Sequence, residues 1–208
     1  MTQNEVEKCI EILFDKLTIA ENNRLIYKQL TELCGIGKQF ECVMKKSNRF
    51  WKLTVSSLCF SIITELAKIF DEQKGAFGIK KLINISSQNT QWFSKWYDEN
   101  GLSHKDFIKQ LEEKYNSIEK KREKLKEIRD VELAHNDRKN LLNTQSNYEG
   151  FNWGDIEDLI ETAYEIINRI SIALSDRQYI IQLENYDDIH YLIKNAYKGM
   201  NNIDKLNN

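Results

Sequence analysis

Apolar residues recur at helical spacing along most of the chain. Between residues 4 and 34 they recur at the spacings of one face of a helix. Gly35 and Gly37 follow this stretch and indicate where it stops. The apolar positions are Val6, Ile10, Leu13, Phe14, Leu17, Leu25, Leu30 and Leu33. We therefore expect a long first helix.

Residues 49 to 71 are apolar over a larger part of the helical circumference. Their sequence is RFWKLTVSSLCFSIITELAKIFD. Helices with this pattern are normally buried on several sides. The pattern predicts that this segment is the central core helix.

The stretch from 71 to 103 is interrupted by glycines and carries short helical patterns at IKKLINI and TQWFSKWYDE. Aromatic residues between positions 92 and 97 could stack on nucleic-acid bases, but at this spacing they more often anchor a short helix to a core. GAFGIKK, residues 75 to 81, has the Gly-x-x-Gly pattern of a KH module, which requires neighbouring strands that the sequence does not indicate. We expect core anchoring for the aromatic residues and a turn followed by a helix for GAFGIKK.

The second half of the chain predicts further helices. Ser103 is a candidate N-cap with Asp106 three residues later, and the apolar stripe that follows continues to Ile128. Residues 136 to 150 are typical of a polar loop. Helical spacing resumes over 153 to 175, and a last helix is expected over about 187 to 198.

Together these elements predict an all-α protein, a helical bundle with additional short helices and no substantial sheet. The sequence contains no proline, the strongest helix breaker. Its 208 residues can form one domain with a real core, and no repeat or linker divides them. We expect a single domain over residues 1–198, with 199–208 as a frayed tail.

Composition narrows the classes of function. Hydrophobic residues make up 41% and charged residues 30%, as in soluble globular proteins. The net charge of −2 gives no bulk attraction to nucleic acid, so such binding would depend on local cations. No stretch approaches the roughly 20 consecutive apolar residues of a membrane span, and no signal peptide is indicated. We expect a cytoplasmic protein without membrane contact.

Neither the cysteines nor the histidines indicate a metal site. Cys9, Cys34, Cys42 and Cys59 show no paired spacing, so we expect reduced cysteines that act as small apolar residues. No histidine has partners at ligand spacing. The sequence therefore predicts neither a metal nor another cofactor.

The segment KEIRDVELAHNDRKN, residues 126 to 140, is the strongest candidate for chemistry. Arg129 precedes His135 by six residues, so on an unbroken helix their side chains would point about 120° apart and lie about 9 Å apart along the axis. The two can share a ligand only if the helix ends or bends near Ala134. The polar residues that follow make such an ending plausible.

Arg129 and His135 together could cleave RNA without a metal. His135 at a helix C-terminus could transfer a proton during attack of the ribose 2′-hydroxyl on the adjacent phosphate. Arg129 could stabilise the negative charge on the pentacoordinate phosphorus, and Asp130 could orient His135 or bind Arg129. The structural alternative is that all three only cap and solvate a helix end, because an Arg and a His at this spacing often occur by chance.

Three stretches resemble the HEPN superfamily, specifically its AbiU-type abortive-infection branch. IRDVELAHND at 128 to 137 resembles the family's signature of an arginine, a polar residue, three to five further residues and a histidine, and ITELAKIFDE at 63 to 72 is similar to the segment that precedes the motif. WGDIEDLIETAYEIINRI at 153 to 170 resembles the helix that follows it. Their order along the chain matches the family.

The resemblance implies a HEPN-like all-α bundle that forms a homodimer, with two Arg/His sets facing a shared cleft. It also implies metal-independent endoribonuclease activity, with RNA as substrate and roles for Arg129, His135 and Asp130. Many relatives are toxins or defend against phage, often with a neighbouring antitoxin.

One departure and two alternatives accompany this resemblance. Some HEPN toxins carry a tyrosine two positions after the histidine, where an antitoxin modifies it, but this chain has Asp137 there. Because the family includes non-catalytic members, a helical dimer that binds RNA or a partner protein is the second hypothesis. A structural bundle within a larger complex is a third.

Overall fold

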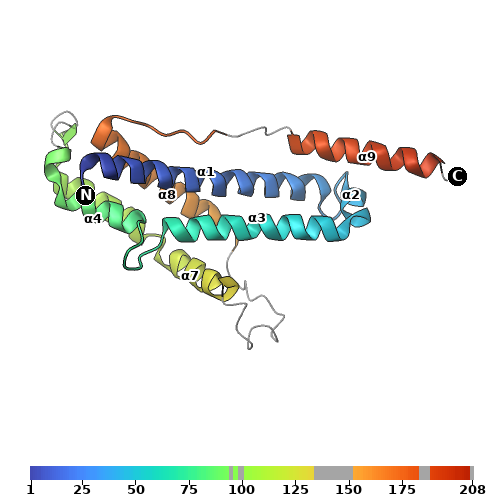
Figure 1. Cartoon of the computed structure of the whole chain (residues 1–208), viewed down its shortest axis with the longest axis horizontal. Coiled ribbons are helices and arrows are strands. Elements are labelled where there is room, and N and C mark those ends of the chain that lie inside the picture. Colours follow the sequence, from blue (N-terminus) through green and yellow to red (C-terminus); the bar gives the residue numbers. More distant parts are fainter. Residues whose placement is uncertain (94–95, 98–100, 134–151, 183–187, 207–208) are drawn as a thin grey trace. The chain divides into compact units, whose positions relative to one another are not determined.

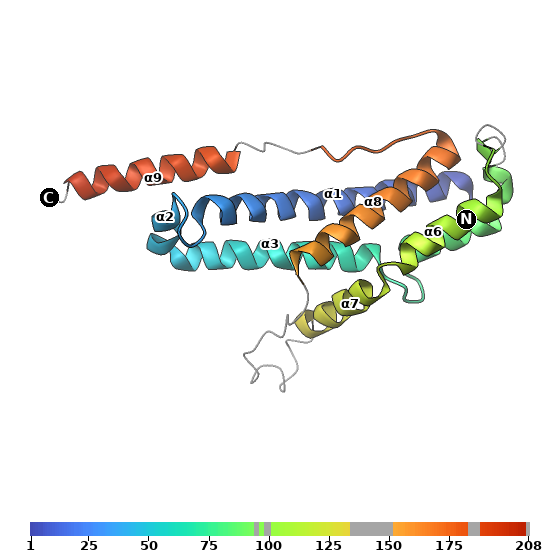
Figure 2. The same ribbon diagram turned by 180° about the vertical axis from the view of Figure 1, so that it is seen from behind.

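A computed structural model describes residues 1–93, 96–97, 101–133, 152–182 and 188–206. The described residues are mostly helical and contain no strand, so the predicted all-α fold is confirmed (Figure 1, Figure 2). The helices are α1 (Gln3–Cys34), α2 (Glu41–Lys46), α3 (Asn48–Ile69), α4 (Ile79–Gln88), the 3₁₀ helix η1 (Thr90–Trp92), α6 (His104–Asn116), α7 (Glu119–Leu133), α8 (Trp153–Ser175) and α9 (Asp188–Leu206).

Contacts divide the chain into two compact units. The first contains residues 1–18 and 63–180, and the second contains 19–62 and 181–208. The prediction of one domain over residues 1–198 stays a prediction. The last helix is longer than the expected 187 to 198, because α9 continues to Leu206.

The first unit is built around α8. This helix begins with a capping box, in which the Asn152 side chain accepts from the backbone N–H of Asp155 and the Asp155 carboxylate accepts from the backbone N–H of Asn152, each at 3.0 Å. Helices α4, α6 and α7 contact it. The helical spacing of its apolar residues explains this position, since α8 buries Ile156, Leu159, Ile160, Ala163, Ile166, Ile167, Ile170, Ala173 and Leu174.

The aromatic residues after α4 belong to the same core, as expected. Phe93 is 1% exposed and Tyr97 8% exposed, and the ring centroids of both lie about 6 Å from Phe107 on α6. Trp96 also contacts Phe107, at 5.1 Å. These contacts confirm core anchoring.

The segment expected as one helix after Ser103 is two helices in the structure. Ser103 does cap α6, since its hydroxyl oxygen accepts from the Asp106 backbone N–H at 3.1 Å. The helix then ends at Asn116, and α7 starts at Glu119 (Figure 2). At the break, the Ser117 hydroxyl donates to the carbonyl of Lys114 at 2.7 Å, a bond that competes with helix continuation.

The second unit has a separate, smaller core. It contains Leu30, Cys34, Phe40, Val43, Trp51 and Ile193. Helix α9 contacts α2 and supplies Ile193, with Ile189, Tyr197 and Met200 packed around it. These positions on α9 lie three or four residues apart, so one face of the helix packs up to Met200.

The prediction that the segment from 49 to 71 is buried on several sides is wrong for its first part. Phe50 is 60% exposed, Leu53 62% and Phe60 46%. From Ile62 to Phe70 the apolar residues are buried. From this part of α3, Trp51 belongs to the core of the second unit and Leu58 packs against it, so the two lie on the side of the helix that is covered there. Among the described helices, α3 has the length and hydropathy that a membrane span requires, and 28% of its apolar 18-residue stretch is buried. Core helices of soluble proteins also meet this criterion.

Candidate active site beside the end of helix α3

Arg129 and Asp130 are the two described members of the predicted site, and both lie on the last two turns of α7. The guanidinium of Arg129 donates to one oxygen of Asp130 twice, from Nε at 2.9 Å and from Nη2 at 2.7 Å. The Arg129 side chain is 16% exposed and that of Asp130 is 55% exposed. Of the two roles considered for Asp130, the structure therefore places it in contact with Arg129.

His135 lies outside the described residues, as do Ala134 and Asp137. Helix α7 is described as far as Leu133. The expectation that the helix ends or bends near Ala134 therefore stays a prediction, and so does the pairing of His135 with Arg129.

A second carboxylate, Asp71, approaches Arg129 from the end of α3. Its Oδ2 lies 3.9 Å from Nη1 of Arg129, while its Oδ1 accepts from the backbone N–H of Gln73 at 2.9 Å. That second bond fixes the Asp71 carboxylate at the start of the turn. In the sequence, the segment ending at Glu72 stands out only by its resemblance to the family. Its contact with Arg129, through Asp71, becomes visible only in the folded structure.

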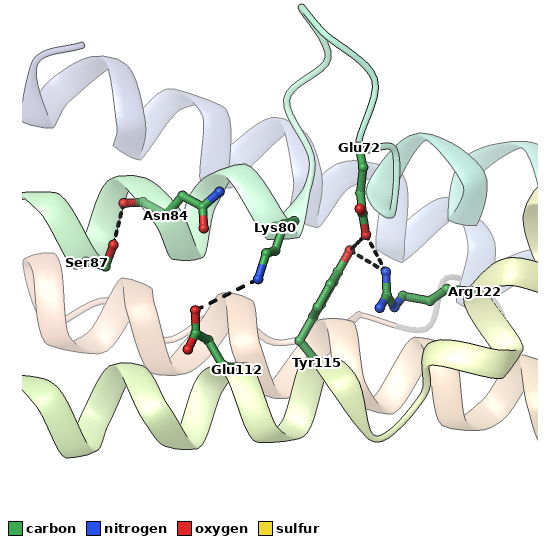
Figure 3. A network of polar contacts seen from close by, with 7 residues as sticks. All are labelled: Glu72, Lys80, Asn84, Ser87, Glu112, Tyr115 and Arg122. Atoms are coloured by element: carbon green, nitrogen blue, oxygen red, sulfur yellow. Dashed lines mark hydrogen bonds and ion pairs between the residues drawn. The ribbon is translucent and has the colours of Figure 1, made fainter.

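The neighbouring residue, Glu72, joins a tight polar cluster with Tyr115 of α6 and Arg122 of α7 (Figure 3). The Tyr115 hydroxyl donates to Glu72 at 2.6 Å, and Arg122 donates to Glu72 and, at 2.8 Å, to the Tyr115 hydroxyl oxygen. The guanidinium carbon of Arg122 also lies 3.8 Å from the centroid of the Tyr115 ring. These contacts fasten the end of α3 to both α6 and α7.

The electrostatics of this cluster favour its charged and bonded form. Partial burial opposes ionisation of Glu72, but the Tyr115 hydrogen bond and the Arg122 charge together hold the pKa of Glu72 below its ordinary value. Burial, and then the hydrogen bond to Glu72, raise the pKa of Tyr115 well above its usual range. At neutral pH the cluster is therefore a carboxylate, a neutral phenol and a guanidinium.

Arg122 and Arg129 both line a pocket of about 320 Å³. Its floor is apolar, with Ala67, Phe70 and Leu125. The polar lining contains more carboxylates than cations: Asp71, Glu72, Glu119 and Glu123 against Arg122, Lys126 and Arg129. The described residues contain no group of three or more His, Cys, Asp or Glu side chains suited to a metal ion.

The contacts of Arg129 are of a kind that a ligand could replace. Asp130 is more than half exposed, and ion pairs of exposed groups contribute little because water and salt screen them. The Asp71 contact is longer than a hydrogen bond. A phosphate would offer Arg129 a bidentate pair of oxygens in the same region.

The described helices form an all-α fold of the kind expected for a HEPN-like bundle. Comparison with family models matches residues 20–193 to AbiU2, a HEPN family, and the chain belongs to this family. It is therefore an abortive-infection-related HEPN domain. No curated protein and no solved structure matches the chain.

Proposed function

We propose that this protein is a metal-independent endoribonuclease that acts as a cytoplasmic homodimer in an abortive-infection or toxin system. The observation that carries the proposal is the position of Arg129, which is largely buried, held by Asp130, and open to a pocket. Membership of the AbiU2 family supports it. An antitoxin or a second defence protein would complete the system.

In the proposed reaction, His135 removes the proton from a ribose 2′-hydroxyl, which then attacks the neighbouring phosphorus. The bond from phosphorus to the 5′-oxygen breaks, a proton is delivered to that oxygen, and a 2′,3′-cyclic phosphate remains. Arg129 exchanges its contact with Asp130 for the non-bridging oxygens and stabilises their added charge in the transition state. Asp130 would then be available to accept from His135.

A second candidate function is a non-catalytic helical dimer that binds RNA or a partner protein. The contacts of Arg129 with Asp130 and Asp71 favour it, because an arginine already paired with two carboxylates can serve structure alone. The two candidates differ in what they require of His135.

Induced expression in bacteria would separate the two candidates. We expect the wild type to arrest growth and fragment RNA, and His135→Ala to lose about 100-fold or more of the cleavage rate, because the proton acceptor is gone. His190→Ala, which removes an exposed histidine on α9, is the matched control and should behave as wild type. Equal growth and equal RNA integrity for wild type and His135→Ala would contradict the ribonuclease proposal.

The purified protein offers a direct check of the chemistry. Cleavage of a single-stranded RNA should leave 2′,3′-cyclic phosphate ends, should persist in EDTA, and should stop when the nucleotide at the cut carries 2′-deoxyribose. Products with free 3′-hydroxyl ends would overturn the mechanism.

A further inference from the structure

Three cations form a row on the side of α7 that faces the pocket. Arg122, Lys126 and Arg129 follow one another at intervals of four and three residues, so they lie within about 60° of one another around the helix. The row is about 10 Å long from end to end. All three line the pocket beside the end of α3.

The two arginines of this row are already engaged within the protein. Arg122 is bonded to Glu72 and stacked on Tyr115, and its side chain is only 12% exposed (Figure 3). Arg129 is bonded to Asp130 and lies near Asp71. Each arginine charge is thus balanced by carboxylates before any ligand arrives.

Lys126 is different. It is exposed at the pocket, and it makes no hydrogen bond or ion pair with any residue that the structure describes. Its ammonium group stands on a flexible stem one helical turn before Arg129, about 4.5 Å along the axis. Carboxylates outnumber cations in the lining, and Glu123 lies three residues before Lys126, so the pocket has no general attraction for a polyanion. A cation that is not bonded to a carboxylate therefore counts individually.

We propose that Lys126 is an RNA-binding residue that contacts the phosphate adjacent to the one held by Arg129. This inference rests on the proposed RNA substrate and adds a binding role for a residue outside the Arg/His motif. Lys126 makes the first contact with the backbone of single-stranded RNA, and Arg129 is then released from Asp130 by the next phosphate. Lys126 therefore contributes to the affinity for RNA rather than to the chemical step.

The test measures binding of a short fluorescein-labelled oligouridylate by anisotropy, in a His135→Ala background that prevents cleavage. Lys126→Gln should weaken binding about three- to tenfold at low salt and reduce the slope of log K against log salt by about 0.7, the value for one phosphate contact on a single strand. Lys126→Arg, which keeps the charge, should retain binding.

Lys124→Gln is the matched control. Lys124 lies on the same helix, about 200° around its circumference from Lys126, and does not line the pocket. The two variants change the net charge equally, so an equal loss of binding would show a general field effect and overturn the proposal. Failure of the His135→Ala protein to bind the RNA would overturn it as well.

The outcome is separable from that of the ribonuclease proposal. If wild type does not cleave RNA but Lys126→Gln loses binding while Lys124→Gln keeps it, the binding role of Lys126 stands and the catalytic proposal falls. If cleavage occurs and Lys126→Gln changes neither binding nor KM, the catalytic proposal stands and the binding role falls.

Discussion

Asp71 and Glu72 are neighbours in sequence but serve different arginines. Glu72 is bonded to the largely buried Arg122, while Asp71 lies near Arg129. Consecutive side chains after a helix diverge, so each carboxylate reaches a different turn of α7. Glu72 thus holds one end of the pocket wall to Arg122 by a hydrogen bond, while the contact of Asp71 with Arg129 at the other end is longer.

Glu72→Gln tests the first of these roles. We expect a loss of about 1 kcal/mol in the free energy of unfolding at neutral pH, because a charge-assisted bond to Arg122 disappears but the half-exposed Glu72 is partly screened by water. Since the pKa of Glu72 is lowered in the folded state, its contribution is present above the ordinary value of 4.5 and is lost as pH falls through the folded pKa. Urea unfolding at neutral and acidic pH measures both effects.

Glu112→Gln is the control for this measurement. Glu112 pairs with Lys80 at 3.8 Å, and both side chains are at least one-third exposed (Figure 3). Its removal should change stability by only a few tenths of a kcal/mol. A difference between wild type and Glu72→Gln that stays constant down to strongly acidic pH would contradict the assigned pKa shift.

At the scale of elements, the turn from α3 to α4 depends on Gly78. A Cβ at this position would lie 2.6 Å from the carbonyl oxygen of Asp71 and 2.7 Å from that of Ile69. The turn therefore folds against the end of α3 closely enough that only glycine fits. The Gly-x-x-Gly pattern that resembles a KH loop forms the turn and helix start expected from the sequence. Its second glycine, Gly78, has this packing role.

Gly78→Ala should destabilise the protein by about 1–3 kcal/mol, because backbone atoms rather than a flexible side chain must move. The displaced segment carries Asp71, so the contact with Arg129 should loosen as well. Thermal unfolding of the variant measures the first effect.

Gly199→Ala is the matched control, since nothing lies within 4 Å of its added Cβ and alanine favours the helix. Equal stability of the Gly78→Ala protein and wild type would show that the turn is not held by this contact.

The sequence predicted the helices well where apolar spacing and caps agree. Helix α8 has both, and its expected range of 153 to 175 matches the structure. The break at Ser117 was missed because the apolar stripe continues across it, and the spacing of apolar residues does not reveal the side-chain hydrogen bond of Ser117. The exposure of Phe50 and Leu53 was also missed, since composition shows that a helix can be buried but not whether other helices cover it.

The candidate site was predictable only in part. The motif gave Arg129 and Asp130, because charged residues at a helix end are visible in sequence. The partners Asp71 and Glu72 are about 50 or more residues away along the chain from Arg129 and Arg122, and no local pattern joins them to α7. Only the fold brings Asp71 and Glu72 to the pocket that Arg122 and Arg129 also line.

At the scale of the whole molecule, the proposed chemistry favours two copies of the chain. Arg129 and His135 point about 120° apart on an unbroken helix, so a second subunit offers another route by which the two groups can meet. We expect light scattering at micromolar concentration to give twice the chain mass of 24.6 kDa. A monomer would remove the shared cleft from the mechanism.

The contacts of Asp71 with Arg129 and of Glu72 with Arg122 also limit where residues could be inserted into the chain. Asp71 and Glu72 are adjacent, and the arginines that they contact are seven positions apart on α7. The spacing of the two arginines must therefore match the positions of the two carboxylates. A single insertion between Arg122 and Arg129 would rotate one of them by about 100° away from its partner. This pairing itself places no such restriction on the number of residues between Gln73 and Tyr115.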